Sequence, residues 1–240
     1  QLSELVKTTG FAEFLELSRD FTLNSLESWE SAMNSVHYLL ALWGRLVAAL
    51  PYLKDEQSTQ REAGILKRCV LDVVGGYIRT MLTTVEAVVM YDKDDPLEDE
   101  SSLREQMERL PVIARLQYEQ VAENIVQMFT QLLEMYSQML QHPRSPELAQ
   151  QILVVEGKMT WLTHMIGAVI GSQSPSDPRR TSVELEWDGQ LSVCVFKLVN
   201  IIDFQLGQTG GEGKCDAKLE VAILSYFKSF KKAYMMKRTG

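Results

Sequence analysis

The chain has 240 residues, of which 45% are hydrophobic and 23% charged, and its formal net charge at pH 7 is −8. These proportions are ordinary for a soluble folded protein, and the length is enough for one large core or a row of small ones. The acidic balance excludes binding of nucleic acid through bulk electrostatics, because phosphate contacts need a surplus of Lys and Arg. Basic partners are therefore favoured.

The three cysteines, Cys69, Cys194 and Cys215, are scattered along the chain. They form no CxxC pair that would hold zinc or a redox disulfide, and this usage fits a reducing compartment. No apolar run approaches the roughly 20 residues of a membrane span, because Arg79 and His164 interrupt the longest candidates. The sequence predicts no membrane insertion.

The chain begins at Gln1 with neither an initiator Met nor the basic and apolar regions of a signal peptide. We expect it to be a segment from the middle of a longer protein.

The first half of the chain shows successive helical patterns. The first runs from Phe11 to Leu26, and the second is expected to be capped by Asn34 and ended by Pro51. Apolar residues of the second helix recur at helical spacing: Val36, Leu39, Leu40, Trp43, Val47 and Leu50. Thr59 and Glu62 have the spacing of a capping box and predict the start of a third helix. Gly75-Gly76 predicts a break before a further helix that holds Ile78, Met81, Leu82, Val85 and Val89.

An acidic loop from Asp92 to Glu100 follows, and Ser102 with Glu105 predicts a capping box after it. Beyond Pro111 the apolar pattern predicts a helix that approaches thirty residues and ends at His142-Pro143. Its apolar positions are Leu116, Ile125, Phe129, Leu132, Leu133, Tyr136 and Leu140.

In the last hundred residues, Ser145 is expected to cap a helix whose first residue is Pro146. Thr181 with Glu184 predicts another capping box, and a glycine-rich loop precedes a last helix from Leu219 to Tyr234. Apolar and polar residues alternate from Val183 to Trp187, but this segment is too short to predict a β-sheet. The whole pattern predicts an all-α fold of about eight helices, and either a compact bundle or a solenoid of stacked helix pairs would satisfy it.

Five sequence blocks carry a resemblance that helix physics does not require. They are SWESAMNSVHYLLALWGRLVAALPYLK from Ser28, DDPLEDE from Asp94, EGKMTWLTHMIGAVIG from Glu156, DGQLSVCVFKLVNIID from Asp188 and KLEVAILSYFKSFKKAYM from Lys218. In this order they closely resemble the exportin-seven and Ran-binding-protein-sixteen/seventeen family, nuclear transport receptors of the importin-beta superfamily. The resemblance covers almost the whole chain, and the loops 54–64, 173–180 and 207–217 depart from it.

The resemblance favours the solenoid, so residues 1–240 are expected to form one continuous segment of HEAT-like antiparallel helix pairs. It also implies a function without enzymatic activity. The intact receptor would bind protein cargo with a basic surface together with the GTP form of Ran, pass through nuclear pores by contact with pore proteins, and shuttle between nucleus and cytoplasm. A helical scaffold or adaptor outside transport is the first alternative, and a helical enzyme with an unrecognised site is the second.

The sequence lacks residues that known nucleotide-binding, calcium-binding and metal-binding motifs require. Gly213-Lys214 suggests a phosphate-binding loop, but Gln208 stands where that motif needs Gly, and Cys215 where it needs Ser or Thr. The aspartates from Asp92 suggest a calcium loop, but Leu97 replaces its required glycine. The three histidines lie far apart without partners at metal-ligand spacing. We therefore expect no catalytic residue, metal ligand or cofactor-binding residue.

The acidic loop is the one candidate binding site. Its carboxylates are expected to contact a basic surface of Ran or cargo, and a purely solvated connection is the alternative. The candidate residues are Asp92, Asp94, Asp95, Glu98, Asp99 and Glu100.

Trp43 and Trp161 are expected to be core anchors, and the isolated segment is expected to self-associate through apolar faces at its two ends.

Overall fold

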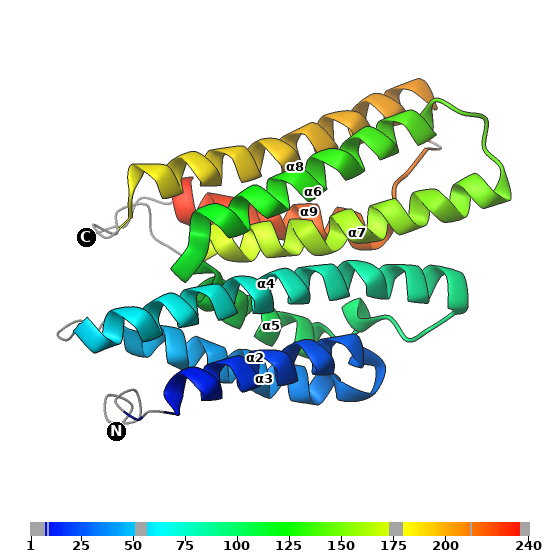
Figure 1. Cartoon of the computed structure of the whole chain (residues 1–240). Helices are drawn as coiled ribbons and strands as arrows, with labels where there is room; N and C mark the ends of the chain where they lie inside the picture. Colours follow the sequence, from blue (N-terminus) through cyan, green and yellow to red (C-terminus); the bar gives the residue numbers. More distant parts are fainter. Residues whose placement is uncertain (1–7, 9, 51–56, 173–179, 212, 236–240) are drawn as a thin grey trace. The chain divides into compact units, whose positions relative to one another are not determined.

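The computed structural model describes residues 8, 10–50, 57–172, 180–211 and 213–235, and these residues contain eight α-helices and no strand (Figure 1). The α-helices are α2 (Phe11–Glu27), α3 (Trp29–Ala49), α4 (Gln57–Tyr91), α5 (Glu100–Ala114), α6 (Tyr118–Leu140), α7 (Pro146–Gly171), α8 (Ser182–Gln208) and α9 (Ala217–Phe230). Two short 3₁₀ turns, η2 (Pro96–Glu98) and η3 (Arg115–Gln117), and a terminal π-helical turn, η4 (Lys231–Met235), complete the elements.

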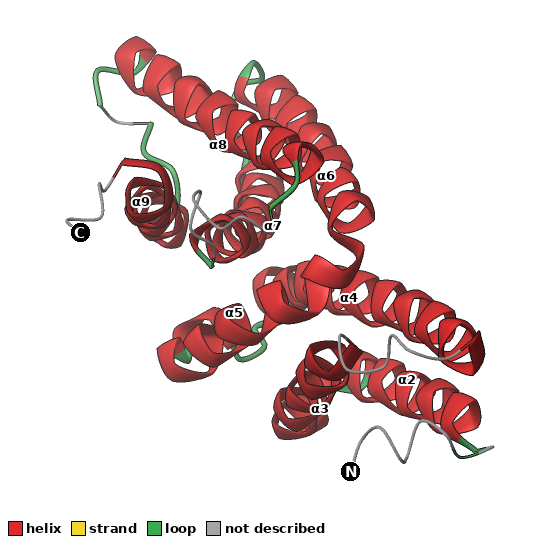
Figure 2. Cartoon of the chain, turned by 90° about the vertical axis from the view of Figure 1, so that its left-hand side faces the viewer, coloured by secondary structure: helices red, strands yellow, loops and turns green. Residues whose placement is uncertain are grey.

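The chain divides into two compact units. Unit 1 comprises residues 1–80 and 99–121, and unit 2 comprises residues 81–98 and 122–240. In unit 1, α3 packs against α2 and α5. In unit 2, α7 and α9 lie side by side, as Figures 1 and 2 both show.

Trp43 is a buried core residue of unit 1, as the sequence predicts. The Trp43 side chain is fully buried, and its indole N–H donates a hydrogen bond of 2.9 Å to the hydroxyl of Thr22. Tyr77 is also fully buried and donates from its hydroxyl to the Gln106 side-chain oxygen at 2.5 Å. Both hydrogen bonds join residues from different helices.

The predicted break at Gly75-Gly76 is wrong, because α4 continues through both residues to Tyr91. A Cβ atom at Gly76 would lie 2.5 Å from a methyl group of Leu23. Glycine is therefore present there because it lets α2 pack closely against α4, and the cost of glycine within a helix is offset by that packing.

Three predicted helix starts are also wrong. Asn34 and Thr59 lie inside α3 and α4, since these helices begin at Trp29 and Gln57. Ser102 lies inside α5, whose N-cap is Asp99. Pro111 also lies inside α5, so the predicted long helix begins only at Tyr118. Capping residues are favoured at helix starts but are also tolerated within helices, where burial of an apolar face decides the boundary.

The later starts are confirmed. Ser145 caps α7, with Pro146 as its first residue, and Thr181 with Glu184 forms the predicted capping box of α8.

Gly167 allows α9 to lie close to α7, because a Cβ atom at this position would lie 3.3 Å from the Tyr226 backbone. Trp161 is fully buried in this unit, as predicted.

Segments within α4 (Gln60–Tyr91) and α8 (Ser182–Gln208) are long and apolar enough to span a membrane by length and composition. Both contain charged residues, among them Arg79 in α4 and Lys197 in α8. A core helix of a soluble protein passes the same test, so this finding is weak support for a membrane span.

Candidate partner-binding surface

The acidic loop connects α4 to α5 and begins with a reversal of the chain. Asp92 has a φ of 52°, in the left-handed region that ends many helices, and the Lys93 N–H donates to the Ala87 carbonyl at 3.4 Å. The turn η2 follows, and Pro96 at its start suits a chain that leaves one helix before beginning the next. Five of the six predicted residues therefore lie in a folded connection, and Glu100 is the first residue of α5.

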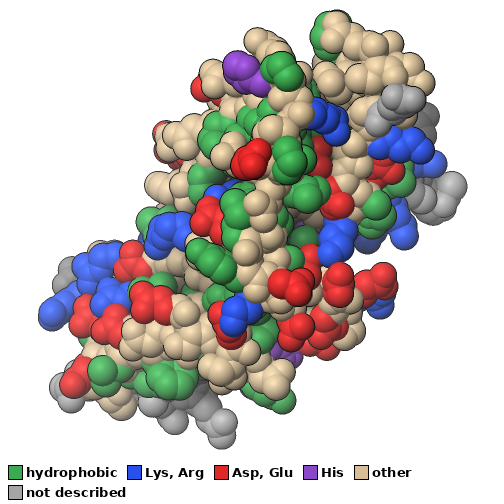
Figure 3. Space-filling model, turned by 90° about the vertical axis from the view of Figure 1, so that its right-hand side faces the viewer, with side chains coloured by type: hydrophobic (Ala, Val, Ile, Leu, Met, Phe, Trp, Pro, Cys, Tyr) green, Lys and Arg blue, Asp and Glu red, His purple; other side chains and the backbone are tan. Residues whose placement is uncertain are grey.

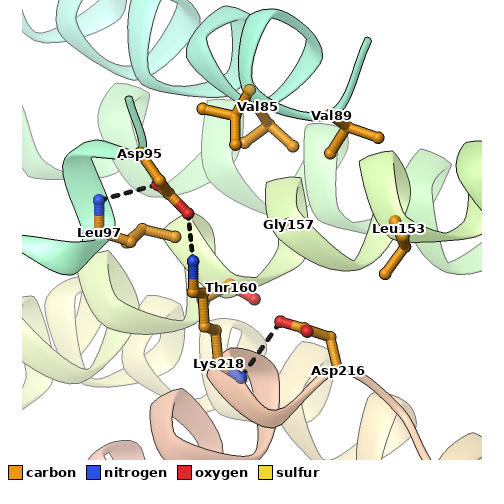
Figure 4. A pocket seen from close by; sticks show the side chains of 10 residues that line it. Val85, Val89, Asp95, Leu97, Leu153, Gly157, Thr160, Asp216 and Lys218 are labelled. Atoms are coloured by element: carbon orange, nitrogen blue, oxygen red, sulfur yellow. Dashed lines mark hydrogen bonds and ion pairs between the residues drawn. The ribbon is translucent and has the colours of Figure 1, made fainter. Parts of the chain in front are cut away.

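Lys218, from the first turn of α9, anchors the middle of this loop. Its Nζ lies 2.6 Å from Oδ2 of Asp95 (Figure 4) and 3.1 Å from Oε1 of Glu98. Burial alone lowers the pKa of Lys218, but the hydrogen bonds and negative charges of Asp95 and Glu98 outweigh it, so the pKa is raised. Asp95 also accepts the Leu97 N–H at 2.9 Å, and its side chain is only 13% exposed. Asp95 therefore holds the loop in place.

Lys218 is the residue of this surface that the sequence analysis missed. It lies 123 residues after Asp95, and no local pattern links the two positions. Its only sequence signal is its place at the beginning of the KLEVAIL block.

Asp99 has a different structural role, at the start of α5. Its carboxylate accepts the Ser102 N–H at 3.0 Å and the Ser101 hydroxyl at 2.7 Å, which makes it the N-cap of α5. These hydrogen bonds lower the pKa of Asp99, because they favour its charged form. Asp99 stabilises a helix start.

Asp92, Asp94 and Glu100 are exposed, and no side-chain hydrogen bond or ion pair involves them within the described residues. The loop lies on the side of Figure 1 that Figure 3 turns toward the viewer, and there Asp and Glu side chains gather beside hydrophobic ones. Three of the six predicted residues are thus available to a partner, while the other three have structural roles.

A groove of about 120 Å³, open to solvent, adjoins the loop (Figure 4). Its lining comes from the end of α4, the loop, α7 and the start of α9: Val85, Val88, Val89, Asp95, Leu97, Leu153, Gly157, Thr160, Asp216 and Lys218. A Cβ atom at Gly157 would lie 2.5 Å from a Val85 methyl group. Glycine therefore permits α7 to pass directly against α4 at the groove.

Unit 2 also contains buried carboxylates near α8 and α9. Glu156 of α7 accepts the Tyr136 hydroxyl at 2.7 Å and the Asp216 N–H at 2.9 Å, and burial raises its pKa. Asp188 accepts hydrogen bonds from Arg180 and from the Tyr234 hydroxyl. Each carboxylate joins segments that are far apart in sequence, so we assign them to stability.

The histidines and the glycine-rich loop offer no catalytic arrangement among the described residues. His37 pairs with Glu105 at 3.1 Å, while burial lowers the pKa of His164 to about 4 and keeps it neutral. The Gly213 N–H donates to the Thr209 hydroxyl at 2.9 Å, which makes an ordinary turn. The described residues contain no cluster of three His, Cys, Asp or Glu side chains that would hold a metal ion.

The chain is similar in sequence to known proteins over most of its length. A family model described as "Exportin-7-like, TPR domain" matches residues 84–239. Exportin-7-B of Xenopus laevis is 37% identical over 235 residues, which are 98% of this chain and 20% of the relative. Ran-binding protein 17 of Homo sapiens and Ran-binding protein 16 of Drosophila melanogaster are each 35% identical over the same shares.

The chain therefore spans about a fifth of the length of these curated relatives. No solved structure matches it significantly. TPR and HEAT repeats are both built from antiparallel helix pairs, so the predicted all-α solenoid class is confirmed. By the family match and the identity to these relatives, the chain belongs to the exportin-7-like family.

Proposed function

We propose that the chain is a segment of a nuclear transport receptor that binds protein cargo together with the GTP form of Ran. The observation that carries this proposal is the 35–37% identity, over 98% of the chain, to proteins named exportin or Ran-binding protein. The receptor would shuttle between nucleus and cytoplasm and contact nuclear pore proteins on its way.

The helical fold is suited to binding without chemistry. In a solenoid each repeat contacts mainly its neighbours, so the array can flex around a large folded surface. In this proposal GTP hydrolysis is carried out by Ran, and the chain contributes surface only.

The acidic loop is the part of the chain that we assign to a basic partner surface, on Ran or on cargo. Asp92 and Asp94 are its exposed carboxylates, and Glu100 is exposed at the start of the adjoining α5. The ion pairs of Lys218 fix the loop that carries Asp92 and Asp94. Each exposed ion pair adds only about 0.2 to 1 kcal/mol, but the fields of neighbouring carboxylates add and accelerate association. The loop would act mainly on the association rate.

The test uses Ran loaded with either a non-hydrolysable GTP analogue or GDP. An immobilised receptor that contains this chain should bind the GTP form much more tightly, and cargo should increase that binding. Equal binding of the two forms would contradict the proposal and favour the alternative, a helical scaffold outside transport.

A further inference from the structure

The groove beside the acidic loop combines apolar walls with carboxylates at one end. Val88, Val89 and Leu97 are half-buried, and Leu153 is 45% exposed, so apolar surface faces water. In Figure 4 the polar side chains of Asp95, Asp216 and Lys218 lie toward the other end. Covering the apolar walls would be favourable, since transfer of apolar surface out of water is the main driving force of association.

The groove is shaped by helix packing as well as by the loop. Gly157 brings α7 against Val85 of α4, and Lys218 of α9 holds Asp95 and Glu98 from the opposite direction. Three helices and an anchored loop thus define its shape before any partner arrives. Such preorganisation reduces the entropy that binding must overcome.

Charge decides what kind of partner fits. Lys218 is already paired with Asp95 and Glu98, and Asp92 and Asp94 remain free and exposed in the same loop. Among the residues that line the groove, Asp95 and Asp216 outnumber the one cation, Lys218, so this end of the groove is negative. It therefore repels phosphate, anionic lipid and acidic peptides. Lysine and arginine are attracted to it.

We propose that the groove binds a short segment of a partner protein, with an aliphatic side chain against Val89 and Leu153 and neighbouring Lys or Arg side chains facing Asp92 and Asp94. This inference deepens the proposed partner-binding role of the loop, because it names the chemistry of the segment that is recognised. Apolar contact in the groove supplies affinity, and the loop carboxylates supply orientation and rate.

Three synthetic peptides of equal length test the proposal without Ran or nucleotide. They have the sequences Lys-Leu-Lys-Lys-Leu-Lys, Lys-Ser-Lys-Lys-Ser-Lys and Glu-Leu-Glu-Glu-Leu-Glu. Each is titrated into the 240-residue chain with labelled Val and Leu methyl groups, and binding is followed by NMR. The leucine–lysine peptide should shift the methyl signals of Val89, Leu97 and Leu153. The affinity of each of the other two peptides should be lower by a factor of at least about ten.

A pair of matched variants locates the binding. Leu153→Gln should weaken the leucine–lysine peptide about fivefold to tenfold, because it removes one apolar wall. Leu224→Gln should leave its affinity unchanged, since Leu224 is 68% exposed on α9 and does not line the groove. Both side chains are exposed enough for the fold to tolerate the change.

Two results would overturn the groove proposal. Equal affinity for the leucine–lysine and serine–lysine peptides would show that charge alone is recognised. The loop would then still bind basic partners, but the groove would have no role in binding. Unchanged affinity in Leu153→Gln would do the same. Failure of the receptor to distinguish the nucleotide states of Ran would instead contradict the transport function and leave the peptide result standing.

Discussion

Unit 1 and unit 2 differ in the polar side chains that they bury. Among the described residues of unit 1, the buried polar side chains are Thr22, Ser25 and Gln106, all neutral. Unit 2 buries two carboxylates, Glu156 and Asp188, in addition to hydroxyl groups. Neutral hydroxyl and amide groups do not titrate in acid, whereas burial raises the pKa of the Glu156 carboxyl, so the stability of unit 2 depends on its protonation. The difference shows that the two units reach stability by different means.

The two buried tryptophans offer the largest test of this comparison. Trp43 in unit 1 and Trp161 in unit 2 are both fully buried, so Trp43→Ala and Trp161→Ala should each lower the free energy of unfolding by about 3 to 5 kcal/mol. Urea unfolding followed by far-ultraviolet circular dichroism measures this loss. A loss below about 1 kcal/mol would exclude the anchoring role, since that is within the range of ordinary surface substitutions.

Substitution by phenylalanine separates the two sites. Trp43 donates a hydrogen bond to Thr22, whereas the Trp161 indole N–H has no acceptor among the described residues. Trp43→Phe should therefore cost about 1 kcal/mol more than Trp161→Phe, because only the first change removes a hydrogen bond. Equal costs would contradict this assignment.

His164 should make unit 2 sensitive to acid. Its pKa is lowered from 6.5 to about 4 by burial, so its stabilising contribution is complete above pH 6.5 and is lost as the pH falls toward 4. The loss amounts to at most about 3 kcal/mol, because one pKa unit corresponds to about 1.4 kcal/mol.

The measurement is the free energy of unfolding at several pH values between these limits. His164→Gln should remove this part of the acid sensitivity, and His142→Gln, at an exposed position of the same unit, should leave it unchanged. If the wild-type chain and His164→Gln show parallel pH profiles, the histidine is not buried in its neutral form.

Much of the fold follows from local sequence, but the decisive contacts do not. Ser145 and Thr181 were predicted as caps correctly because each precedes a strong apolar pattern. The break predicted at Gly76 is wrong because local sequence does not reveal its contact with Leu23, which lies in a helix more than fifty residues earlier in the chain. The candidate site shows the same limit, since composition identifies the acidic loop but only the tertiary structure pairs Asp95 with Lys218.

The anchoring of the loop predicts a smaller, local effect. Lys218→Met should lower global stability by less than about 1 kcal/mol, because the ion pair is partly exposed. It should nevertheless speed hydrogen exchange at the Leu97 amide, which Asp95 accepts. Lys214→Met, at an exposed position in the preceding loop, is the matched control. Unchanged exchange in Lys218→Met would mean that the lysine does not hold the loop.

The most direct test of the partner-binding surface is the rate at which GTP-loaded Ran or a basic cargo protein associates with the receptor, measured over a series of salt concentrations. Asp92→Asn with Asp94→Asn removes two free carboxylates and leaves Asp95 and Asp99 in their structural roles. Glu186→Gln with Asp203→Asn changes the net charge equally at exposed positions of α8 and serves as control. The loop variant should associate several times more slowly and with a flatter salt dependence, since screening acts over about 8 Å at physiological ionic strength. Equal rates and equal salt slopes in the loop variant, the control variant and the unchanged receptor, for both Ran and cargo, would contradict the account and leave the loop as a solvated connection.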